Sequence, residues 1–106
     1  MNDLMRPALY SARHTIEEIQ DSNAESKNYE VVGPVCETAD SFGQNHNLKA
    51  KTGDQLIIYS TGAYGSSMGS NYNSRPKPAE ILVSKDSFKV IRKAESFEDL
   101  IRLEEI

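Results

Sequence analysis

An arginine and a tyrosine four positions apart stand near the start of the chain, in Arg-Pro-Ala-Leu-Tyr (6–10). If this segment forms a helical turn, Arg6 and Tyr10 lie on one side of it. The guanidinium group of Arg6 is a planar fork suited to a carboxylate, and the phenol of Tyr10 adds a hydroxyl donor. Because residues at this spacing are often paired on helices, spacing alone favours a surface arginine and a half-buried tyrosine over a carboxylate site.

A thiol and a carboxylate are adjacent at Cys36 and Glu37, where a predicted strand gives way to a loop. A thiol exchanges protons near neutral pH, and a carboxylate binds an ammonium group. From residue types alone, a buried cysteine that packs as a small hydrophobic side chain is the stronger interpretation. A hydrolase dyad of Cys36 and His46 is the weakest, because no third group and no oxyanion hole stand at recognisable spacing.

A third candidate is Gly-Ala-Tyr-Gly (62–65), which opens a run of small and polar residues. Small residues let the backbone approach a ligand closely, and backbone amides there could bind an anion. The ring of Tyr64 could stack on, or hydrogen-bond to, a flat phosphorylated cofactor. The motif is weak by itself and equally fits a glycine-rich turn with a packed tyrosine; it is not a P-loop, because no Lys-Ser/Thr follows. His14 and His46 lack metal-ligand spacing, so we expect solvated or structural histidines and no metal site.

The elements that would position these residues are mostly short strands. The polar segments 21–28 and 41–51 are expected to be loops, and 62–78 to be a long irregular loop with a functional role. At the end of the chain, Ser96 and Asp99 predict the start of a closing helix. The class is therefore mainly β with a short C-terminal helix. The expected strands are 14–20, 29–36 with a kink at Gly33-Pro34, 55–60, and the hairpin strands 80–83 and 88–93.

Length, charge and cysteine content exclude several classes of protein. A chain of 106 residues suits one domain, and its 38% of hydrophobic residues allow a modest core. A net charge of −4 argues against a nucleic-acid binder, and no apolar stretch approaches the roughly 18 residues of a membrane span. The single cysteine excludes an intrachain disulfide, and residues 1–10 are not a signal peptide. We therefore expect a cytoplasmic protein that binds neither nucleic acid nor membrane.

Taken in order, several segments resemble the carboxy-terminal third of the diaminopimelate decarboxylase family, and the match spans essentially the whole chain. Order and spacing agree together, which makes the resemblance more specific than any single motif. Ornithine and arginine decarboxylases share the architecture, but the strings at 6–10 and 70–76 favour the diaminopimelate branch. The segments are Met-Asn-Asp-Leu-Met-Arg-Pro-Ala-Leu-Tyr (1–10), Gly-Pro-Val-Cys-Glu-Thr-Ala-Asp (33–40), Gly-Asp (53–54), Gly-Ala-Tyr-Gly (62–65), Ser-Asn-Tyr-Asn-Ser-Arg-Pro-Lys-Pro-Ala-Glu (70–80) and Glu-Ser-Phe-Glu-Asp-Leu (95–100).

The resemblance implies a role for each candidate residue in a pyridoxal-phosphate-dependent enzyme. Arg6 and Tyr10 would hold the distal carboxylate of the substrate, and Glu37 would bind its distal ammonium group. Cys36 would be the catalytic thiol that handles a proton in the active site of the partner subunit. Tyr64 would contact both cofactor and substrate. The full enzyme would decarboxylate meso-diaminopimelate to L-lysine.

The resemblance also implies a second module. In this family an α/β barrel carries the lysine that binds the cofactor covalently. A β-domain similar to this chain, expected to be a Greek-key-like β-barrel or sandwich, completes the active site across a homodimer. We expect residues 1–106 to be that single β-domain without the N-terminal barrel, and therefore inactive alone. The alternative is a non-catalytic binding or assembly module that docks on a separate decarboxylase barrel.

Two segments depart from the pattern of the family. Its Cys-Glu-Ser-Gly-Asp stands here as Cys-Glu-Thr-Ala-Asp (36–40), in which Thr38 keeps a hydroxyl group and Ala39 makes a positive φ less favourable. Its Asp-Ala-Gly-Ala-Tyr stands here as Ser-Thr-Gly-Ala-Tyr (60–64), which loses an acidic side chain. Both changes affect local geometry more than chemistry.

Overall fold

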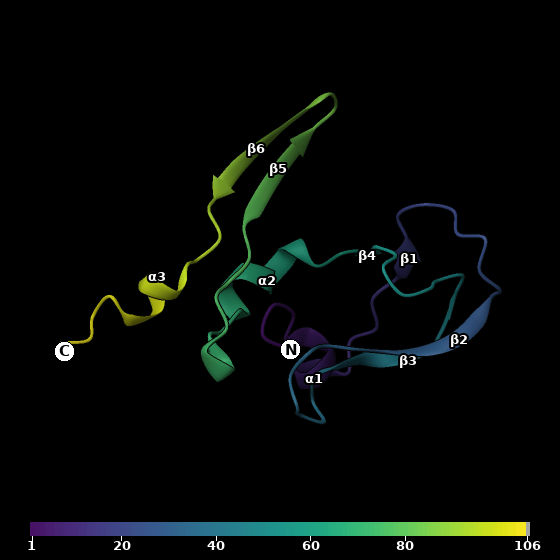
Figure 1. Ribbon diagram of the computed structural model, residues 1–106, viewed down its shortest axis with the longest axis horizontal. Coiled ribbons are helices and arrows are strands. Elements are labelled where there is room, and N and C mark those ends of the chain that lie inside the picture. The colour runs from purple at the N-terminus through teal and green to yellow at the C-terminus, as the bar shows by residue number, and fades with distance from the viewer. Residues whose placement is uncertain (106) are drawn as a thin grey trace.

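A computed structural model describes residues 1–105 as a mainly β chain, built from antiparallel pairs of strands and a few short helices (Figure 1). Each strand has one hydrogen-bonded neighbour, so the sheets are two-stranded ribbons. Within residues 1–105 they do not join into one closed sheet. The elements are α1 (Arg6–Tyr10), β1 (Ile16–Glu18), β2 (Lys27–Val32), β3 (Ser41–Leu48), β4 (Leu56–Ile58), α2 (Gly62–Met68), a 3-10 turn (Tyr72–Ser74), β5 (Glu80–Ser84), β6 (Ser87–Arg92) and α3 (Phe97–Ile101).

The ribbon of β2 and β3 is irregular, and its irregularity has a local cause. Tyr29 pairs with His46, whereas Val31 pairs with Gly43, so β3 carries extra residues in a bulge. Gly43 has a φ of 110°, which a residue with a side chain rarely adopts. The guanidinium group of Arg13 donates to the carbonyl oxygens of bulge residues 44 and 45, at 3.1 Å each. The bulge is thereby tied to the segment that follows α1.

The hydrophobic core is small and is formed by one residue that precedes α1, one from β1 and one from β3. Leu4, Ile16 and Leu48 are its buried hydrophobic side chains. Strand β1 pairs with β4, with Ile16 opposite Ile58, which carries the chain from this core toward α2. Buried polar side chains share this core, and four of them (Asn2, His14, Asp40 and His46) accept or donate hydrogen bonds or lie within hydrogen-bond distance of a backbone carbonyl oxygen.

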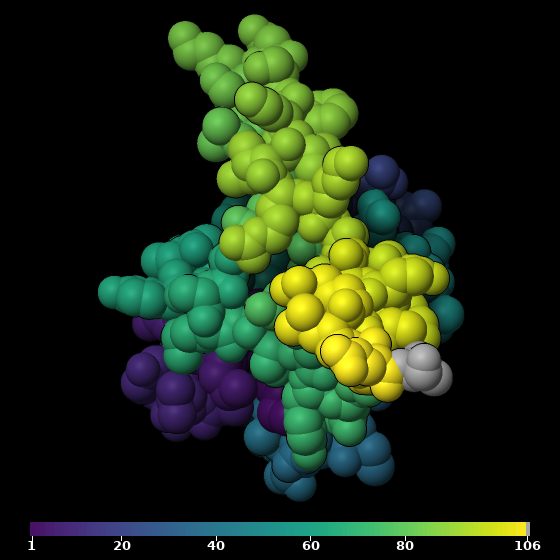
Figure 2. All heavy atoms as spheres, turned by 90° about the vertical axis from the view of Figure 1, so that its left-hand side faces the viewer, coloured from purple at the N-terminus to yellow at the C-terminus, as the bar shows by residue number. Residues whose placement is uncertain are grey.

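The β5–β6 hairpin and α3 follow local sequence signals. Glu80 to Ser84 pairs with Ser87 to Arg92 across a two-residue turn, as expected for a hairpin. Ser96 and Asp99 form a capping box at the start of α3, as the sequence predicted. The turn end of the hairpin projects from the rest of the molecule in both views, while its base lines a pocket together with α2 (Figures 1 and 2). Its apolar side chains, such as Val83 and Phe88, are exposed.

Four sequence predictions were wrong in detail. The loop expected over 21–28 ends before Lys27, where β2 begins. Residues 41–51, expected to be a loop, contain β3, the longest strand; its polar side chains face solvent while His46 and Leu48 face inward. The strand expected over 29–36 ends at Val32, because Gly33-Pro34 begins a turn. The segment 62–78, expected to be irregular, contains α2 and the 3-10 turn, although α2 is kinked near its start.

The molecule is open rather than compact. Its radius of gyration is 15.8 Å, against about 13 Å for a compact domain of this length. Its accessible surface is 8316 Å², against roughly 5900 Å² for a compact monomer of the same mass. No helix within residues 1–105 has the length and apolar character needed to cross a bilayer.

Candidate functional site

Helix α1 presents the first pair of candidate residues. The helix starts with Pro7 in its first turn and ends where Ser11 adopts a left-handed φ of 53°. Because the segment is helical, Arg6 and Tyr10 lie one turn apart on one face, as their spacing predicted. Arg6 is half-buried and Tyr10 is exposed. Both side chains have room to meet a ligand from the solvent side.

Cys36 and Glu37 sit on a tight turn between β2 and β3. The Glu37 amide donates to the carbonyl oxygen of Val35 at 2.8 Å, and the Asp40 amide donates to that of Glu37 at 3.0 Å. The Cys36 thiol is exposed. The buried, packed cysteine that residue types favoured is therefore wrong, and the thiol is open to a reaction partner. Glu37 is exposed beside it.

Asp40 holds this turn from inside. Its side chain is 1% exposed, and one carboxylate oxygen lies against the backbone nitrogen of Met1. The other carboxylate oxygen accepts a hydrogen bond from the Val35 amide at 2.8 Å. The Gly33 amide donates to the backbone carbonyl oxygen of Asp40 at 2.8 Å, which closes the loop at its base. A buried carboxylate thus fixes the backbone on which the exposed thiol and Glu37 stand.

Tyr72 reaches the same turn from a distant part of the sequence. Its hydroxyl donates to Glu37 Oε2 at 3.1 Å. This hydrogen bond and the negative charge of Glu37 raise the pKa of Tyr72. The backbone around Tyr72 is fixed by Asn2, whose side-chain amide donates to the carbonyl oxygens of Ser70 and Tyr72 at 3.1 and 2.7 Å. Segment 70–72 is therefore attached to both the N-terminal segment and the turn.

Tyr64 lies in α2 at a strained backbone position. Its φ is 67° and its ψ −11°, which are non-helical values inside a helix, and residues with side chains seldom adopt them. The side chain is 67% exposed. Gly69, just after α2, lies against the backbone carbonyl of Asn2, so α2 ends at the same N-terminal segment. The strained backbone and the exposed ring present Tyr64 outward from the protein.

The two histidines are structural. His14 and His46 are both buried. A ring nitrogen of His14 lies 2.9 Å from the carbonyl oxygen of Tyr59, and one of His46 lies 3.2 Å from that of Phe42. His46 is thus buried and occupied while the Cys36 thiol is exposed, an arrangement that does not favour a hydrolase dyad. Among residues 1–105, no three side chains of metal-binding type come together.

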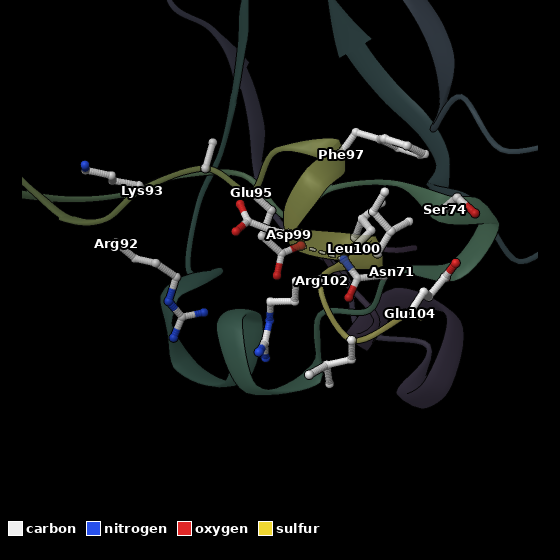
Figure 3. A pocket seen from close by; sticks show the side chains of 13 residues that line it. Asn71, Ser74, Arg92, Lys93, Glu95, Phe97, Asp99, Leu100, Arg102 and Glu104 are labelled. Atoms are coloured by element: carbon white, nitrogen blue, oxygen red, sulfur yellow. Dashed lines mark hydrogen bonds between the residues drawn. The ribbon is translucent and has the colours of Figure 1, made fainter. Parts of the chain in front are cut away.

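Pockets on the surface are lined mostly by other residues than the five candidates. One of about 340 Å³ is bounded by α1 and by Thr38 and Ala39, so α1 and the Cys36–Glu37 turn are side by side. Another, of about 770 Å³, lies beside α3, where Asn71 donates to Glu95 Oε2 at 2.6 Å (Figure 3). Arg6, Tyr10, Cys36, Glu37 and Tyr64 line neither of these two pockets. Tyr10, Cys36, Glu37 and Tyr64 are exposed and Arg6 is half-buried, so the candidates lie at the surface and not in these two cavities.

The structure brings α1, the Cys36–Glu37 turn and segment 70–72 together around residues 1–5, with the end of α2 alongside. Three residues of this arrangement were missed by sequence reasoning: Asn2, Asp40 and Tyr72. A short acidic side chain at the end of a loop is a common turn signal and could have indicated Asp40. No local signal indicates Tyr72, because its partner Glu37 lies 35 positions away.

A family model described as "Pyridoxal-dependent decarboxylase, C-terminal sheet domain" matches residues 1–62, more than half of the chain. The chain belongs to this family. The resemblance identified from the sequence motifs is thereby confirmed, as is the mainly β class with few helices.

Curated relatives and solved structures agree on the branch of the family. The chain is 50% identical to diaminopimelate decarboxylase from Helicobacter pylori over 99% of its own length and 26% of the relative's. It is 48% identical to that from Neisseria meningitidis serogroup A, over 92% and 24%. The M. jannaschii enzyme in co-complex with L-lysine matches with a TM-score of 0.92 and 41% identity, over 100% of this chain and 24% of that one. The chain thus spans about a quarter of the length of the relatives it matches.

Proposed function

We propose that residues 1–106 are the carboxy-terminal β-domain of a pyridoxal-phosphate-dependent diaminopimelate decarboxylase. The domain supplies side chains that bind substrate and cofactor for the decarboxylation of meso-diaminopimelate to L-lysine. Arg6 and Tyr10 bind the distal carboxylate, Glu37 binds the distal ammonium group, Cys36 handles the proton and Tyr64 contacts cofactor and substrate.

One observation carries the proposal: the turn with Cys36 and Glu37 is fixed from within, yet both side chains face solvent. A fixed backbone that holds exposed reactive side chains suits a site that is completed by residues of a second protein module. The surplus of roughly 2400 Å² of accessible surface over a compact monomer is in the range that permanent interfaces bury. The domain therefore presents its reactive side chains on a surface that is large enough to dock against a second module.

The residues of this chain could form part of a binding site for pyridoxal phosphate, but they do not form a complete one. Tyr64 offers an exposed phenol on a turn flanked by Gly62 and Gly65, and no side chain atom crowds either glycine. A flat ring and a phosphate group could approach that backbone closely. A lysine anchor for the cofactor is expected on the α/β barrel, as the resemblance implies.

Pyridoxal phosphate would supply an electron sink for the carbon from which the carboxylate leaves as carbon dioxide. The Cys36 thiol then donates its proton to that carbon, and the thiolate recovers a proton from solvent. Arg6 and Tyr10 orient the substrate by its far carboxylate through charge-assisted hydrogen bonds. Glu37 holds the far ammonium group, so that the carboxylate that is lost is the one at the reacting end.

The proposal includes the closed form of the β-domain, the modules that it binds and the cellular compartment of the enzyme. The ribbons close into a Greek-key-like barrel or sandwich when further strands pair with their free edges, because unpaired edges seek partners. The partner modules are the N-terminal α/β barrel and a second copy of the enzyme, so that Cys36 and Glu37 serve the active site of a homodimer. The enzyme works in the cytoplasm on a small amino-acid substrate.

The test joins this domain to an α/β barrel of the family, either in one polypeptide or as two chains. With pyridoxal phosphate, the assembly should release L-lysine and carbon dioxide from meso-diaminopimelate, while residues 1–106 alone should release neither. Cys36→Ser should lower kcat by about 100-fold or more, the usual loss for a proton-transfer group.

Thr52→Ala, which changes an exposed hydroxyl in the turn before β4, serves as the control and should keep full activity. An assembly that leaves diaminopimelate unchanged, or a Cys36→Ser variant as active as the Thr52→Ala control, would contradict the proposal. Decarboxylation by residues 1–106 alone would contradict the need for a second module.

A further inference from the structure

The carboxylate of Glu37 has a partner on a different segment of the chain. Tyr72 Oη donates to Glu37 Oε2 at 3.1 Å, across 35 positions of sequence. Both residues are exposed, so the contact lies at the surface where a ligand would arrive. The other carboxylate oxygen, Oε1, is left to accept hydrogen bonds from a ligand.

Both ends of this contact are anchored. On one side, the backbone of Glu37 is hydrogen-bonded to Val35 and Asp40 within the turn. On the other side, Asn2 holds the carbonyl oxygen of Tyr72 at 2.7 Å, and Asn2 is itself buried. What remains free is the rotation of the Glu37 side chain, and the phenol restricts it. An exposed glutamate would otherwise sample several rotamers, at an entropic cost when it binds a ligand.

We propose that Tyr72 is a positioning residue that aims the Glu37 carboxylate at an ammonium group of the substrate. The inference rests on the proposed function and extends it to a residue with no role assigned so far. A neutral phenol suits this task, because it orients the carboxylate without cancelling its negative charge. A lysine or arginine in the same place would compete with the substrate for Glu37.

The contact has a signature that does not depend on catalysis. Glu37 raises the pKa of Tyr72, because an ionised phenol would lose the hydrogen bond and face a second negative charge. In residues 1–106, Glu37→Gln should therefore lower the pKa of Tyr72, followed by NMR of the ring carbon next to the hydroxyl. Tyr59 is a matched reference, since its pKa is raised by a similar contact with Glu17 and should not respond to Glu37→Gln.

The second measurement uses the assembled enzyme and separates positioning from simple support of the fold. Tyr72→Phe removes one hydroxyl group and keeps the ring. It should raise KM for meso-diaminopimelate about 3- to 10-fold, with kcat changed less than about twofold. The inhibition constant of 2-aminopimelate, which has both carboxylates but no distal amine, should stay the same. Tyr59→Phe is the control and should change neither constant.

Each outcome decides a different point. An unchanged pKa of Tyr72 in the Glu37→Gln variant would overturn the inference, regardless of the kinetic results for the assembled enzyme. Equal weakening of diaminopimelate and 2-aminopimelate by Tyr72→Phe would also overturn it, because a general loss of structure affects both ligands. An assembly inactive toward diaminopimelate would overturn the proposed function and with it the substrate part of the inference, whereas the titration would still decide whether Tyr72 holds Glu37.

Discussion

The Asp40 carboxylate accepts a hydrogen bond from the Val35 amide at 2.8 Å. This carboxylate is almost completely buried, and its other oxygen lies against the backbone nitrogen of Met1. The same residue therefore links the N-terminal segment that precedes Arg6 to the turn that carries Cys36 and Glu37. In a molecule with so small a hydrophobic core, such a link has a large share in fixing the relative positions of these side chains.

The first prediction concerns the buried carboxylate of Asp40. In residues 1–106, Asp40→Asn removes the buried charge and should lower the free energy of unfolding by about 1–3 kcal/mol. Because the turn loses its support from inside, amide hydrogen exchange at Val35 should become faster. Urea unfolding and exchange monitored by NMR measure the two effects. Asp86→Asn, in the exposed turn between β5 and β6, is the control and should change stability by less than about 0.5 kcal/mol.

A second prediction concerns Gly33, which lies directly against Asp40. A methyl group at this position would overlap the Asp40 carboxylate, which is held on both oxygens and cannot simply move aside. Gly33→Ala should therefore destabilise the chain by about 1–3 kcal/mol through overpacking. Gly62→Ala is the matched control, because no atom lies within 4 Å of the added methyl group there. Equal stability of the two variants would mean that the turn does not pack as described.

The sequence predicted the elements that depend on neighbouring residues. The β5–β6 hairpin follows from two β-rich runs around a short turn, and the start of α3 follows from Ser96 and Asp99. Strand β3 was missed because Gln44, Asn45 and Asn47 make it look like a loop. Its inward residues His46 and Leu48 alternate with period two, a signal too short to outweigh that polarity.

In the candidate site, too, features that depend on neighbouring residues were predicted and features that depend on distant residues were not. The spacing of Arg6 and Tyr10 placed them on one side only on the condition that their segment is helical, and α1 meets that condition. The exposure of Cys36 was not predicted, because residue type favours burial and only the buried Asp40 beneath the turn leaves the thiol outside. The link between Glu37 and Tyr72 joins segments 35 positions apart, and such tertiary contacts leave no local pattern in a single sequence.

A third prediction uses the strained backbone of Tyr64. Its φ of 67° raises the conformational free energy of a residue with a Cβ atom, whereas glycine adopts such a φ without this steric strain. Since the ring is exposed, Tyr64→Gly loses little packing and should raise the free energy of unfolding of residues 1–106 by about 0.5–1 kcal/mol. In the assembled enzyme the same change should weaken pyridoxal phosphate binding. Ala63→Gly, at a φ of −68°, is the control and should lower stability.

The last prediction concerns pH and Glu95, which joins segment 71–77 to the start of α3. The Lys77 amide donates to Glu95 Oε2 at 2.8 Å and the Asn71 side chain at 2.6 Å. These hydrogen bonds, first that of Lys77 and then that of Asn71, lower the pKa of Glu95 below its ordinary value of 4.5. The folded state therefore binds this proton less readily than the unfolded chain, and protonation of Glu95 weakens the junction.

The stabilisation by Glu95 is fully present above pH 4.5 and is lost as the pH falls through the lowered pKa of the folded state. Amide exchange at Lys77 should accordingly gain protection between the lowered pKa and pH 4.5, after correction for the intrinsic exchange rate. Glu95→Gln should abolish this pH dependence while leaving exchange at Val35, which Asp40 protects, unchanged. An equal pH dependence in the wild type and in Glu95→Gln would show that another group controls this junction.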